Sequence, residues 1–345
     1  MHACLFSLHV GRNRPQVQAS SRGNGSKRSA GDSVDGSLEI FHNIFKNVKK
    51  VIVGKDDKIR AVLCCWIAGG HCLIEDAPGT GKTMLARASA KSVQADFTRV
   101  QFTPDLLPSD ILGTSIFNQN THDFEFVKGP LFTTVFLGDE INRATPRTQS
   151  ALLESMAEGQ ITSDGKTRDL PPLFFVMATQ NPIEQQGTFP LPEAQLDRFM
   201  MKISMGYPKP EEEIAIIKGQ SESHPIQTLE AVETQERLNY LRKIVPQIRV
   251  SDGIFQYIAK IINKTRSTPH LRLGASPRAT VAMVRAAQAL ALSEGKDYVD
   301  PAYIYHLVKP VVAHRLVISP EARLEGRTTE TILDDLRKEV PVPVN

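Results

Sequence analysis

The sequence predicts an α/β protein in which a parallel five-stranded sheet lies between helices and is followed by an all-α domain. Short, β-rich apolar runs recur between residues 71 and 205, separated by helical or irregular stretches. They are apolar at consecutive positions, which is typical of strands buried on both faces of a parallel sheet. After Pro208 and Pro210 no convincing strand follows, and amphipathic helices take over. These observations divide the chain into residues 38–207 and residues 208–345.

Residues 1–37 are predicted to form a disordered N-terminal extension. From Arg12 to Ser37 the chain is rich in serine, glycine, asparagine and arginine, with almost no large apolar residue. Such a segment cannot bury enough surface to fold. Order is expected to begin near Leu38, where apolar residues recur on one helical face up to Gly54.

The remaining elements follow from the same patterns. In the first domain we expect strands over residues 71–75, 96–102, 133–139, 173–179 and 200–205, and helices over residues 58–70 and 82–93. In the second domain we expect helices over residues 211–219, 234–245, 252–266, 276–295 and 300–316.

Charge and cysteine content narrow the class of protein. The net charge of +3 lies in residues 1–37, which hold five Lys or Arg against two Asp. The body is therefore neutral, and a nucleic-acid partner is not expected. The four cysteines form no CxxC pair, which fits buried thiols in a reducing compartment. No segment reaches the roughly 18 uncharged apolar residues of a membrane-spanning helix, so a cytoplasmic location is expected.

The stretch EDAPGTGKT, residues 75–83, is a candidate phosphate-binding loop. Asp76 stands where the usual pattern has its first glycine, but the GKT ending is intact and the loop joins a predicted strand to a predicted helix. Backbone N–H groups and the positive helix end would bind phosphate oxygens. Lys82 would reach the β- and γ-phosphates, and the Thr83 hydroxyl would hold Mg²⁺. The predicted nucleotide-binding residues of this loop are Pro78, Gly79, Thr80, Gly81, Lys82 and Thr83.

A pair of carboxylates ends the apolar run 133–139. In nucleotide hydrolases the first carboxylate, here Asp139, holds the Mg²⁺ shell, and the second, here Glu140, can orient and polarise the attacking water. Adjacent carboxylates after a strand also occur as solvated turn charges. Their combination with a GKT loop favours the catalytic interpretation, with Thr83 and Asp139 as the predicted Mg²⁺ ligands.

Longer blocks of sequence carry a resemblance to a known family. They are EDAPGTGKT, RVQFTPDLLPSDILG, FEFVKGPLF, GDEINRATPRTQSALLESMAEGQIT, ATQNPIEQQGTFPLPEAQLDRF and GASPRA. In this combination the chain resembles the MoxR family of AAA+ ATPases over about residues 38–320. The resemblance implies a P-loop NTPase core with a helical lid domain, and ATP and Mg²⁺ as cofactors. Family members commonly have Glu-Asp at positions 75–76, so Asp76 is not an anomaly.

The resemblance also implies roles for residues outside these two motifs. Asn181 matches sensor 1, which monitors the γ-phosphate and the attacking water. The pair Val53-Gly54 matches the segment that contacts adenine. A turn-forming Asn and a helix terminator are the plainer interpretations of these positions.

The resemblance also implies an arginine finger, for which the sequence offers three candidates, and a sensor-2 arginine. Arg198 matches the arginine finger, which reaches the nucleotide of the neighbouring subunit, so that hydrolysis depends on assembly. Arg143 and Arg147 are alternative candidates for the finger. Arg278 matches sensor 2, which the helical lid carries over the same nucleotide.

Two insertions fit the helix-2-insert clade of AAA+ proteins. Residues 113–132 match the insert itself, and residues 159–170 alternate around Asp164-Gly165 as a β-hairpin before sensor 1. In related machines such loops face the ring pore and touch the remodelled protein. We expect both segments to be polar and to lack an aromatic pore pair, which favours remodelling of a partner over threading of a polypeptide.

The resemblance implies a homo-oligomeric ring, expected to be a hexamer, that remodels or matures partner complexes. A metalloenzyme client and a partner with a von Willebrand factor A domain would fit the family. One alternative is a DNA-translocating or helicase-like ATPase, which the neutral body disfavours. Another is a non-hydrolysing, nucleotide-dependent scaffold, which the intact Asp139-Glu140 pair disfavours.

Overall fold

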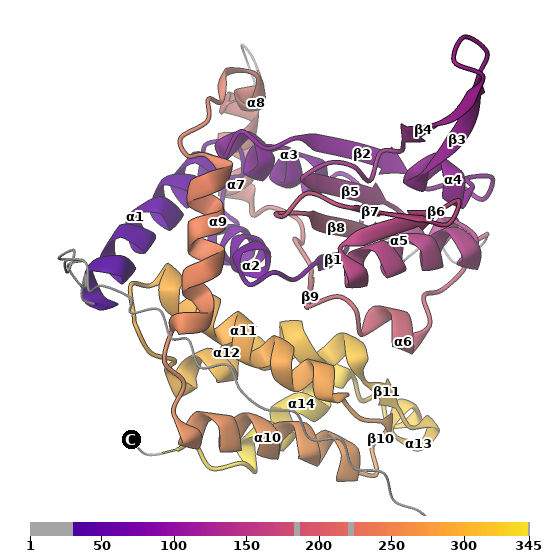
Figure 1. Cartoon of the computed structure of the whole chain (residues 1–345). Helices are drawn as coiled ribbons and strands as arrows, with labels where there is room; N and C mark the ends of the chain where they lie inside the picture. Colours follow the sequence, from indigo (N-terminus) through magenta and orange to yellow (C-terminus); the bar gives the residue numbers. More distant parts are fainter. Residues whose placement is uncertain (1–29, 183–186, 220–223, 344–345) are drawn as a thin grey trace, which may run out of the picture.

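Five parallel strands form the central sheet of the protein. The computed structural model describes residues 30–182, 187–219 and 224–343, with side chains from residue 36 onward. The strands lie in the order β2 (Phe97–Gln101), β5 (Val135–Asp139), β8 (Phe175–Gln180), β1 (Cys72–Glu75) and β9 (Met201–Ile203) (Figure 1). All four neighbouring pairs are parallel, so the carboxyl ends of the strands meet at one edge, where open α/β sheets bind ligands. The predicted sheet is confirmed.

Helices cover both faces of this sheet. On one face α1 (Ala30–Lys49), α2 (Asp56–Ile67) and α3 (Lys82–Ser92) share a buried apolar cluster with Cys72 and Ile74 of β1. On the other face α4 (Pro108–Leu112) and α5 (Pro146–Glu158) share a second cluster with Leu73, also from β1. Successive strand residues point to opposite faces, and burial on both faces therefore explains why the strands are apolar at consecutive positions.

Helix α1 begins earlier than the sequence predicts. It starts at Ala30, eight residues before Leu38. Phe41, Ile44 and Val48 are fully or almost fully buried and anchor the helix. Nucleation is the unfavourable step in helix formation, whereas extension of an existing helix costs little. This accounts for a helix that includes residues 30–37, which are mostly small or polar. Residues 1–29 lie outside the described residues, so disorder there stays a prediction.

The C-terminal part of the chain is helical, as predicted. It contains α7 (Pro210–Gly219), α8 (Pro225–Thr228), α9 (Gln235–Ile244), α10 (Asp252–Ser267), α11 (Pro277–Ser293), α12 (Pro301–Val312), α13 (Pro320–Leu324) and α14 (Thr329–Lys338). A short antiparallel ribbon of β10 (Leu271–Leu273) and β11 (Val317–Ile318) was not expected. Strands of two or three residues are too short to produce a recognisable alternation.

Helix α9 packs on the first domain, beside α1 and α2 (Figure 1). The Asn47 side chain donates to the Glu230 carbonyl oxygen at 2.8 Å, and the Asn43 side chain donates to the Glu233 carboxylate at 2.8 Å. The chain therefore returns to the core after leaving it, and the boundary at residues 207 and 208 stays a prediction.

Three of the four cysteines are described, and they are free and buried: Cys64, Cys65 and Cys72. Burial raises the pKa of Cys64 to about 12, which keeps this thiol protonated and unreactive. The expectation of buried thiols is confirmed for these residues, whereas Cys4 lies outside the described residues.

The first domain carries two antiparallel hairpins. One pairs β3 (Gly113–Asn118) with β4 (Asp123–Lys128), and the other pairs β6 (Gln160–Ser163) with β7 (Lys166–Asp169) (Figure 1). They contact each other, because the Ser115 hydroxyl donates to the Asp164 carboxylate at 2.6 Å. The Arg168 guanidinium also lies over the Phe126 ring, 3.6 Å from its centroid. The predicted second hairpin is confirmed.

Candidate nucleotide-binding site

The candidate phosphate loop joins β1 to α3 at the carboxyl edge of the sheet. β1 ends at Glu75 and α3 begins at Lys82. Gly79 and Gly81 have φ angles of 80° and 87°, a region that residues with a side chain rarely adopt. A Cβ at Gly79 would meet no atom within 4 Å, so the backbone faces open space there. The loop therefore has the glycine-dependent, open form that binds phosphate oxygens through backbone N–H groups.

The Lys82 ammonium lies over this loop. It donates to the carbonyl oxygens of Asp76 and Ala77 at 3.0 and 2.8 Å. An ammonium has three donors, so these two bonds leave one donor unassigned. The position of Lys82 fits the role of a phosphate-binding lysine.

Asp76 has a structural role at the start of the loop. It is 8% exposed, and its carboxylate accepts hydrogen bonds from the backbone N–H of Ala77 at 3.0 Å and of Gly206 at 2.7 Å. Asp76 is not one of the described non-glycine residues with a positive φ, so its position does not require glycine. Its carboxylate instead ties the phosphate loop to the segment that follows β9.

Asp139, the predicted Mg²⁺ ligand, ends β5 beside β2 and β8. Its Oδ1 accepts a hydrogen bond from the Thr179 hydroxyl at 2.6 Å. Its Oδ2 accepts two bonds from the guanidinium of Arg99, from Nη2 at 2.7 Å and from Nε at 3.1 Å. Both oxygens of this carboxylate are therefore oriented by neighbouring strands.

Glu140 follows in a left-handed conformation, with φ 57°. Its backbone N–H donates to the Thr179 hydroxyl oxygen at 2.9 Å. Its Oε2 accepts hydrogen bonds from the Gln101 side chain at 2.7 Å and from Arg143 Nε at 2.8 Å. Left-handed non-glycine residues are uncommon and cluster at functional sites. The turn directs the Asp139 and Glu140 side chains to different partners at the same edge.

Asn181 and Val53-Gly54, assigned from the family resemblance, both lie near the loop. Asn181 is buried and follows β8, which lies between β5 and β1. The Ile52 side chain is 3.9 Å from where a Cβ on Gly81 would lie, so the segment before Val53 contacts the phosphate loop. The structure therefore brings Asn181, the segment before Val53, the loop and the carboxylates to one region.

Arg198 and Arg278 lie together, at the other end of the strands. Asp197, which is next to Arg198, lies four residues before β9 begins, at the amino end of that strand. The phosphate loop follows β1, which is parallel to β9, so the loop lies at the opposite, carboxyl end. Arg278 Nη1 lies 4.0 Å from the Asp197 carboxylate, and Arg198 donates to the Leu153 carbonyl oxygen at 2.6 Å. Both arginines are therefore near the amino edge, separated by the sheet from the loop of their own chain.

The two alternative finger candidates have different surroundings. Arg143 forms the ion pair with Glu140 of its own chain, which directs its guanidinium to its own site. Arg147 is exposed in the first turn of α5. Arg143 is thus the less suitable of the two for reaching a neighbouring subunit.

The residues present fit Mg²⁺ and a nucleoside triphosphate. Mg²⁺ prefers hard oxygen ligands, and the Thr83 hydroxyl and the Asp139 carboxylate supply them. Thr83 lines a hollow of about 710 Å³ between α3 and β2, together with Arg99 and Arg87. The glycine cradle and the Lys82 ammonium supply donors for phosphate.

Three polar residues of the site were missed by the sequence analysis: Arg99, Gln101 and Thr179. Arg99 and Gln101 lie two residues apart in β2, on the same side of the strand, in the block RVQF. Thr179 lies two residues before Asn181. These patterns could have marked them, but their partners depend on which strands are neighbours.

The β3–β4 hairpin corrects one expectation. We expected a polar insert without an aromatic pair, but Phe117 and Phe124 face each other across the strands with ring centroids 5.4 Å apart. They are 52% and 68% exposed, and Ile116 and Val127 are also exposed. The expectation was wrong because the aromatic residues are separated by six polar or small residues in sequence and meet only after the strands pair.

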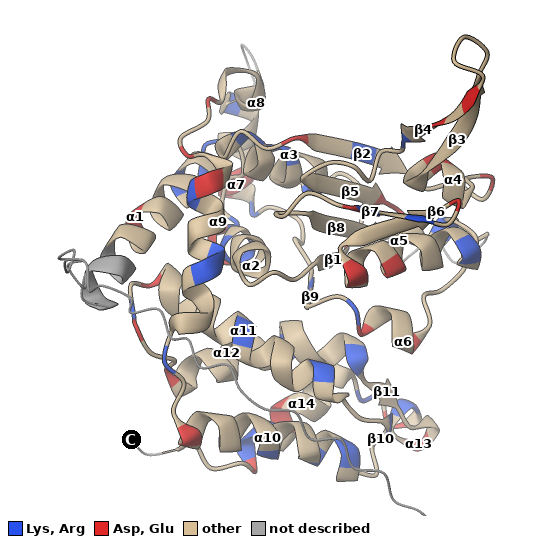
Figure 2. Ribbon diagram, viewed as in Figure 1, with Lys and Arg blue, Asp and Glu red and all other residues tan. Residues whose placement is uncertain are grey.

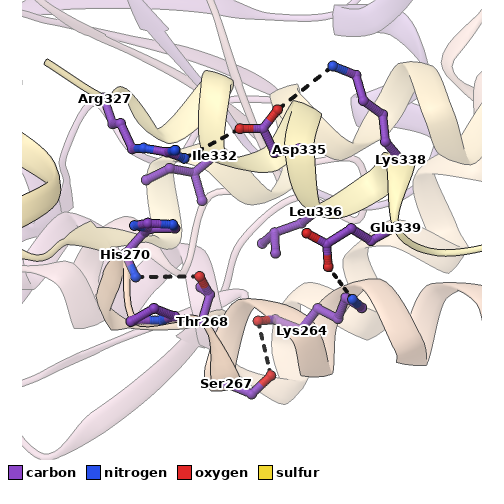
Figure 3. A pocket seen from close by; sticks show the side chains of 11 residues that line it. Lys264, Ser267, Thr268, His270, Arg327, Ile332, Asp335, Leu336, Lys338 and Glu339 are labelled. Atoms are coloured by element: carbon purple, nitrogen blue, oxygen red, sulfur yellow. Dashed lines mark hydrogen bonds and ion pairs between the residues drawn. The ribbon is translucent and has the colours of Figure 1, made fainter. Parts of the chain in front are cut away.

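A second hollow, of about 670 Å³, lies on the helical domain beside α10 and α14 (Figure 3). Lys264 pairs with Glu339, and Asp335 lies 3.4 Å from Arg327 and 3.7 Å from Lys338. Only the Lys264–Glu339 pair joins α10 to the end of α14, because Arg327, Asp335 and Lys338 all lie within or just before α14. We interpret these pairs as salt bridges at the surface of the helical domain, not as a second ligand site.

Comparisons with known proteins agree with this geometry. Residues 71–201 match a family model described as "ATPase family associated with various cellular activities (AAA)", and residues 263–336 match one for the AAA lid domain. The uncharacterized protein YeaC of Bacillus subtilis is 50% identical over 87% of this chain and 93% of its own length. Chaperone MoxR1 of Mycobacterium tuberculosis is 39% identical over 86% of this chain and 80% of its own length. The crystal structure of a proposed ATPase from Cytophaga hutchinsonii matches with a TM-score of 0.85 and 36% identity, covering 92% and 98% of the two chains.

The fold and the site define a P-loop nucleotide-binding protein with an AAA core and a helical lid domain. The sequence relationships are more specific than that class. The chain belongs to the MoxR family of AAA+ ATPases. Within the part of the chain that the structure describes, no helix combines the length and apolar character needed to cross a membrane.

Proposed function

We propose that this chain binds Mg-ATP and hydrolyses it to ADP and phosphate. The proposal rests chiefly on the meeting of the phosphate loop and the carboxylates at one sheet edge, where Thr179 bonds to both Asp139 and Glu140. Lys82 would bind the β- and γ-phosphates, and Thr83 and Asp139 would hold Mg²⁺. Bound Mg²⁺ would neutralise charge on the phosphates. Glu140 would orient and polarise the attacking water.

We further propose that a second copy of the chain completes each site. Arg198 and Arg278 lie near the amino edge of the sheet, so neither is suited to reach the phosphate loop of its own chain. Head-to-tail contacts between identical subunits would bring them to the loop of a neighbour, and such contacts close into rings. Arg198 would then neutralise the charge that develops on the γ-phosphate. A cytoplasmic, hexameric ring is the form we propose.

The work of the ring is proposed to be the remodelling of partner proteins. Exposed apolar surface marks sites of protein interaction, and the projecting β3–β4 hairpin carries Phe117 and Phe124. The chaperone name of the mycobacterial relative supports this role. Maturation of a metalloenzyme, with a von Willebrand factor A-domain partner, is the finer form of the proposal and rests on family resemblance.

A DNA-translocating role has less support. Lys and Arg are intermixed with Asp and Glu in both domains, as Figure 2 shows. The β6–β7 hairpin carries only Lys166 and Arg168 as basic residues. Proteins that bind nucleic acid present a one-sided basic surface. Stimulation of ATP turnover by DNA would reverse this ranking.

Parallel binding and turnover measurements test the proposal. The parent chain is expected to bind a fluorescent ATP analogue and to release phosphate. Glu140→Gln is expected to bind the analogue but to release phosphate about 100-fold or more slowly, because it lacks the carboxylate that polarises water. Lys82→Ala is the control for binding and is expected not to bind the analogue. Absence of binding by the parent, or unchanged turnover in Glu140→Gln, would overturn the proposal.

A further inference from the structure

Arg99 occupies the Mg²⁺ side of the candidate site. It comes from the middle of β2 and lines the same hollow as Thr83. Its Nη2 and Nε both donate to Oδ2 of Asp139, at 2.7 and 3.1 Å. The guanidinium therefore contacts the carboxylate that would hold the metal ion and shares a hollow with the residue that would supply the hydroxyl ligand.

The contacts of Asp139 leave little room for a second cation beside Arg99. Each carboxylate oxygen accepts about two hydrogen bonds. Thr179 uses part of the capacity of Oδ1, and the two Arg99 donors use that of Oδ2. A metal ion at this carboxylate would also lie close to the guanidinium charge, and like charges repel at such distances.

We infer that Arg99 is a placeholder cation, which neutralises Asp139 before nucleotide binds and releases this carboxylate when Mg²⁺ enters with the nucleotide. The inference rests on the proposed function, because it assumes that the site takes Mg-ATP. It adds a positioning residue on β2 to the residues of the phosphate loop and the carboxylate pair. No role for Arg99 follows from the motifs in the sequence.

The exposure of the two partners supports this exchange. The Arg99 side chain is 48% exposed and that of Asp139 is 13% exposed. A half-exposed guanidinium recovers water when it leaves, so separating such a pair costs little. Asp139 would lose a needed counter-charge if no cation replaced it. Arg99 also donates to the Gln101 side chain at 3.3 Å, which gives it a second contact on its own strand.

Titration of Mg²⁺ at a fixed concentration of fluorescent nucleotide tests the inference without measuring turnover. Arg99→Gln removes the competing charge and is expected to lower the Mg²⁺ concentration for half-maximal binding about two- to five-fold, the range of a partly exposed ion pair. Nucleotide affinity at saturating Mg²⁺ is expected to stay within about two-fold of the parent, because Arg99 then no longer contacts Asp139.

Arg87→Gln is the matched control, since Arg87 lines the same hollow from α3. It is expected to leave the Mg²⁺ midpoint nearly unchanged. An unchanged or higher midpoint in Arg99→Gln, or an equal shift in Arg87→Gln, would overturn the inference. So would loss of nucleotide binding by folded Arg99→Gln at saturating Mg²⁺. Failure of the proposed function would give a different result, because the parent protein itself would then not bind the fluorescent nucleotide.

Discussion

Asp197 and Arg315 form an ion pair between the core and the helical domain, with Arg315 Nε 3.4 Å from Asp197 Oδ1. Arg315 is only 3% exposed, and burial lowers its pKa to about 10 while the Asp197 carboxylate opposes that shift. The Ser276 hydroxyl also donates to Asp197, at 2.9 Å. The residue before Arg198 is thus held by two segments of the helical domain, so a movement of that domain would carry the proposed finger with it.

Replacement of Arg198 by Ala is expected to abolish ATP hydrolysis while leaving nucleotide binding largely intact. An arginine that stabilises the transferred phosphoryl group contributes roughly 1,000-fold or more to turnover. Phosphate release by preassembled protein would measure this loss. Arg147→Ala, which removes an exposed arginine of α5, serves as the control. If Arg198→Ala kept its turnover and Arg147→Ala lost it, Arg147 would be the finger instead.

Removal of the Asp197 carboxylate is expected to destabilise the fold. Asp197→Ala leaves the Arg315 guanidinium buried without its counter-charge, which costs about 3 kcal/mol in comparable buried pairs. Chemical denaturation would report the free energy of unfolding. Asp335→Ala removes a carboxylate that pairs with Arg327 and Lys338 and is 53% exposed, and it is expected to cost less than about 1 kcal/mol. Equal losses of unfolding free energy in the two variants would show that the buried Asp197 pair stabilises the fold no more than an exposed ion pair does.

Stability is expected to fall as the solution becomes acidic, because two histidines are buried. Burial lowers the pKa of His71 to about 4 and that of His314 to about 3. Below the ordinary value of about 6.5 the unfolded chain binds protons that the folded chain excludes. The stabilising contribution is therefore complete above pH 6.5 and is lost as the pH falls toward 4.

Denaturant unfolding between pH 7 and pH 4 would measure this effect. For His71 alone the difference amounts to about 3 kcal/mol at pH 4. His71 accepts from the Val176 N–H and contacts the Met156 carbonyl oxygen, and Gln offers both a donor and an acceptor. His71→Gln is expected to flatten the pH dependence. An equally steep dependence in that variant would contradict the assignment.

Much of the fold could be predicted because each buried strand has an apolar run that can be recognised by itself. The apolar run before Asp139 and the GKT loop identify their elements without knowledge of their neighbours. The contacts of Arg99 with Asp139 and of Gln101 with Glu140 could not be predicted in this way. They depend on β2 lying beside β5, and these two strands are separated in sequence by a helix and a hairpin.

Two further features depend on how segments come together. Phe117 and Phe124 form an exposed pair only because the β3–β4 hairpin fixes their register. Arg278 lies beside Asp197 because the helical domain packs against the amino edge of the sheet. Local sequence reports which residues can be buried or bind phosphate, whereas these positions follow from the packing of distant segments.

The central claim, that one subunit holds the triphosphate and its neighbour triggers hydrolysis, is tested most directly by mixing two inactive variants. Lys82→Ala lacks the phosphate lysine and Arg198→Ala lacks the finger, so each alone is expected to be inactive. Co-assembled in equal amounts, they form some sites with an intact lysine and an intact finger from different chains. Random head-to-tail assembly predicts recovery of about a quarter of the parental turnover. Mixtures that stay inactive, or a parent that hydrolyses ATP equally fast as separated single chains, would contradict the account.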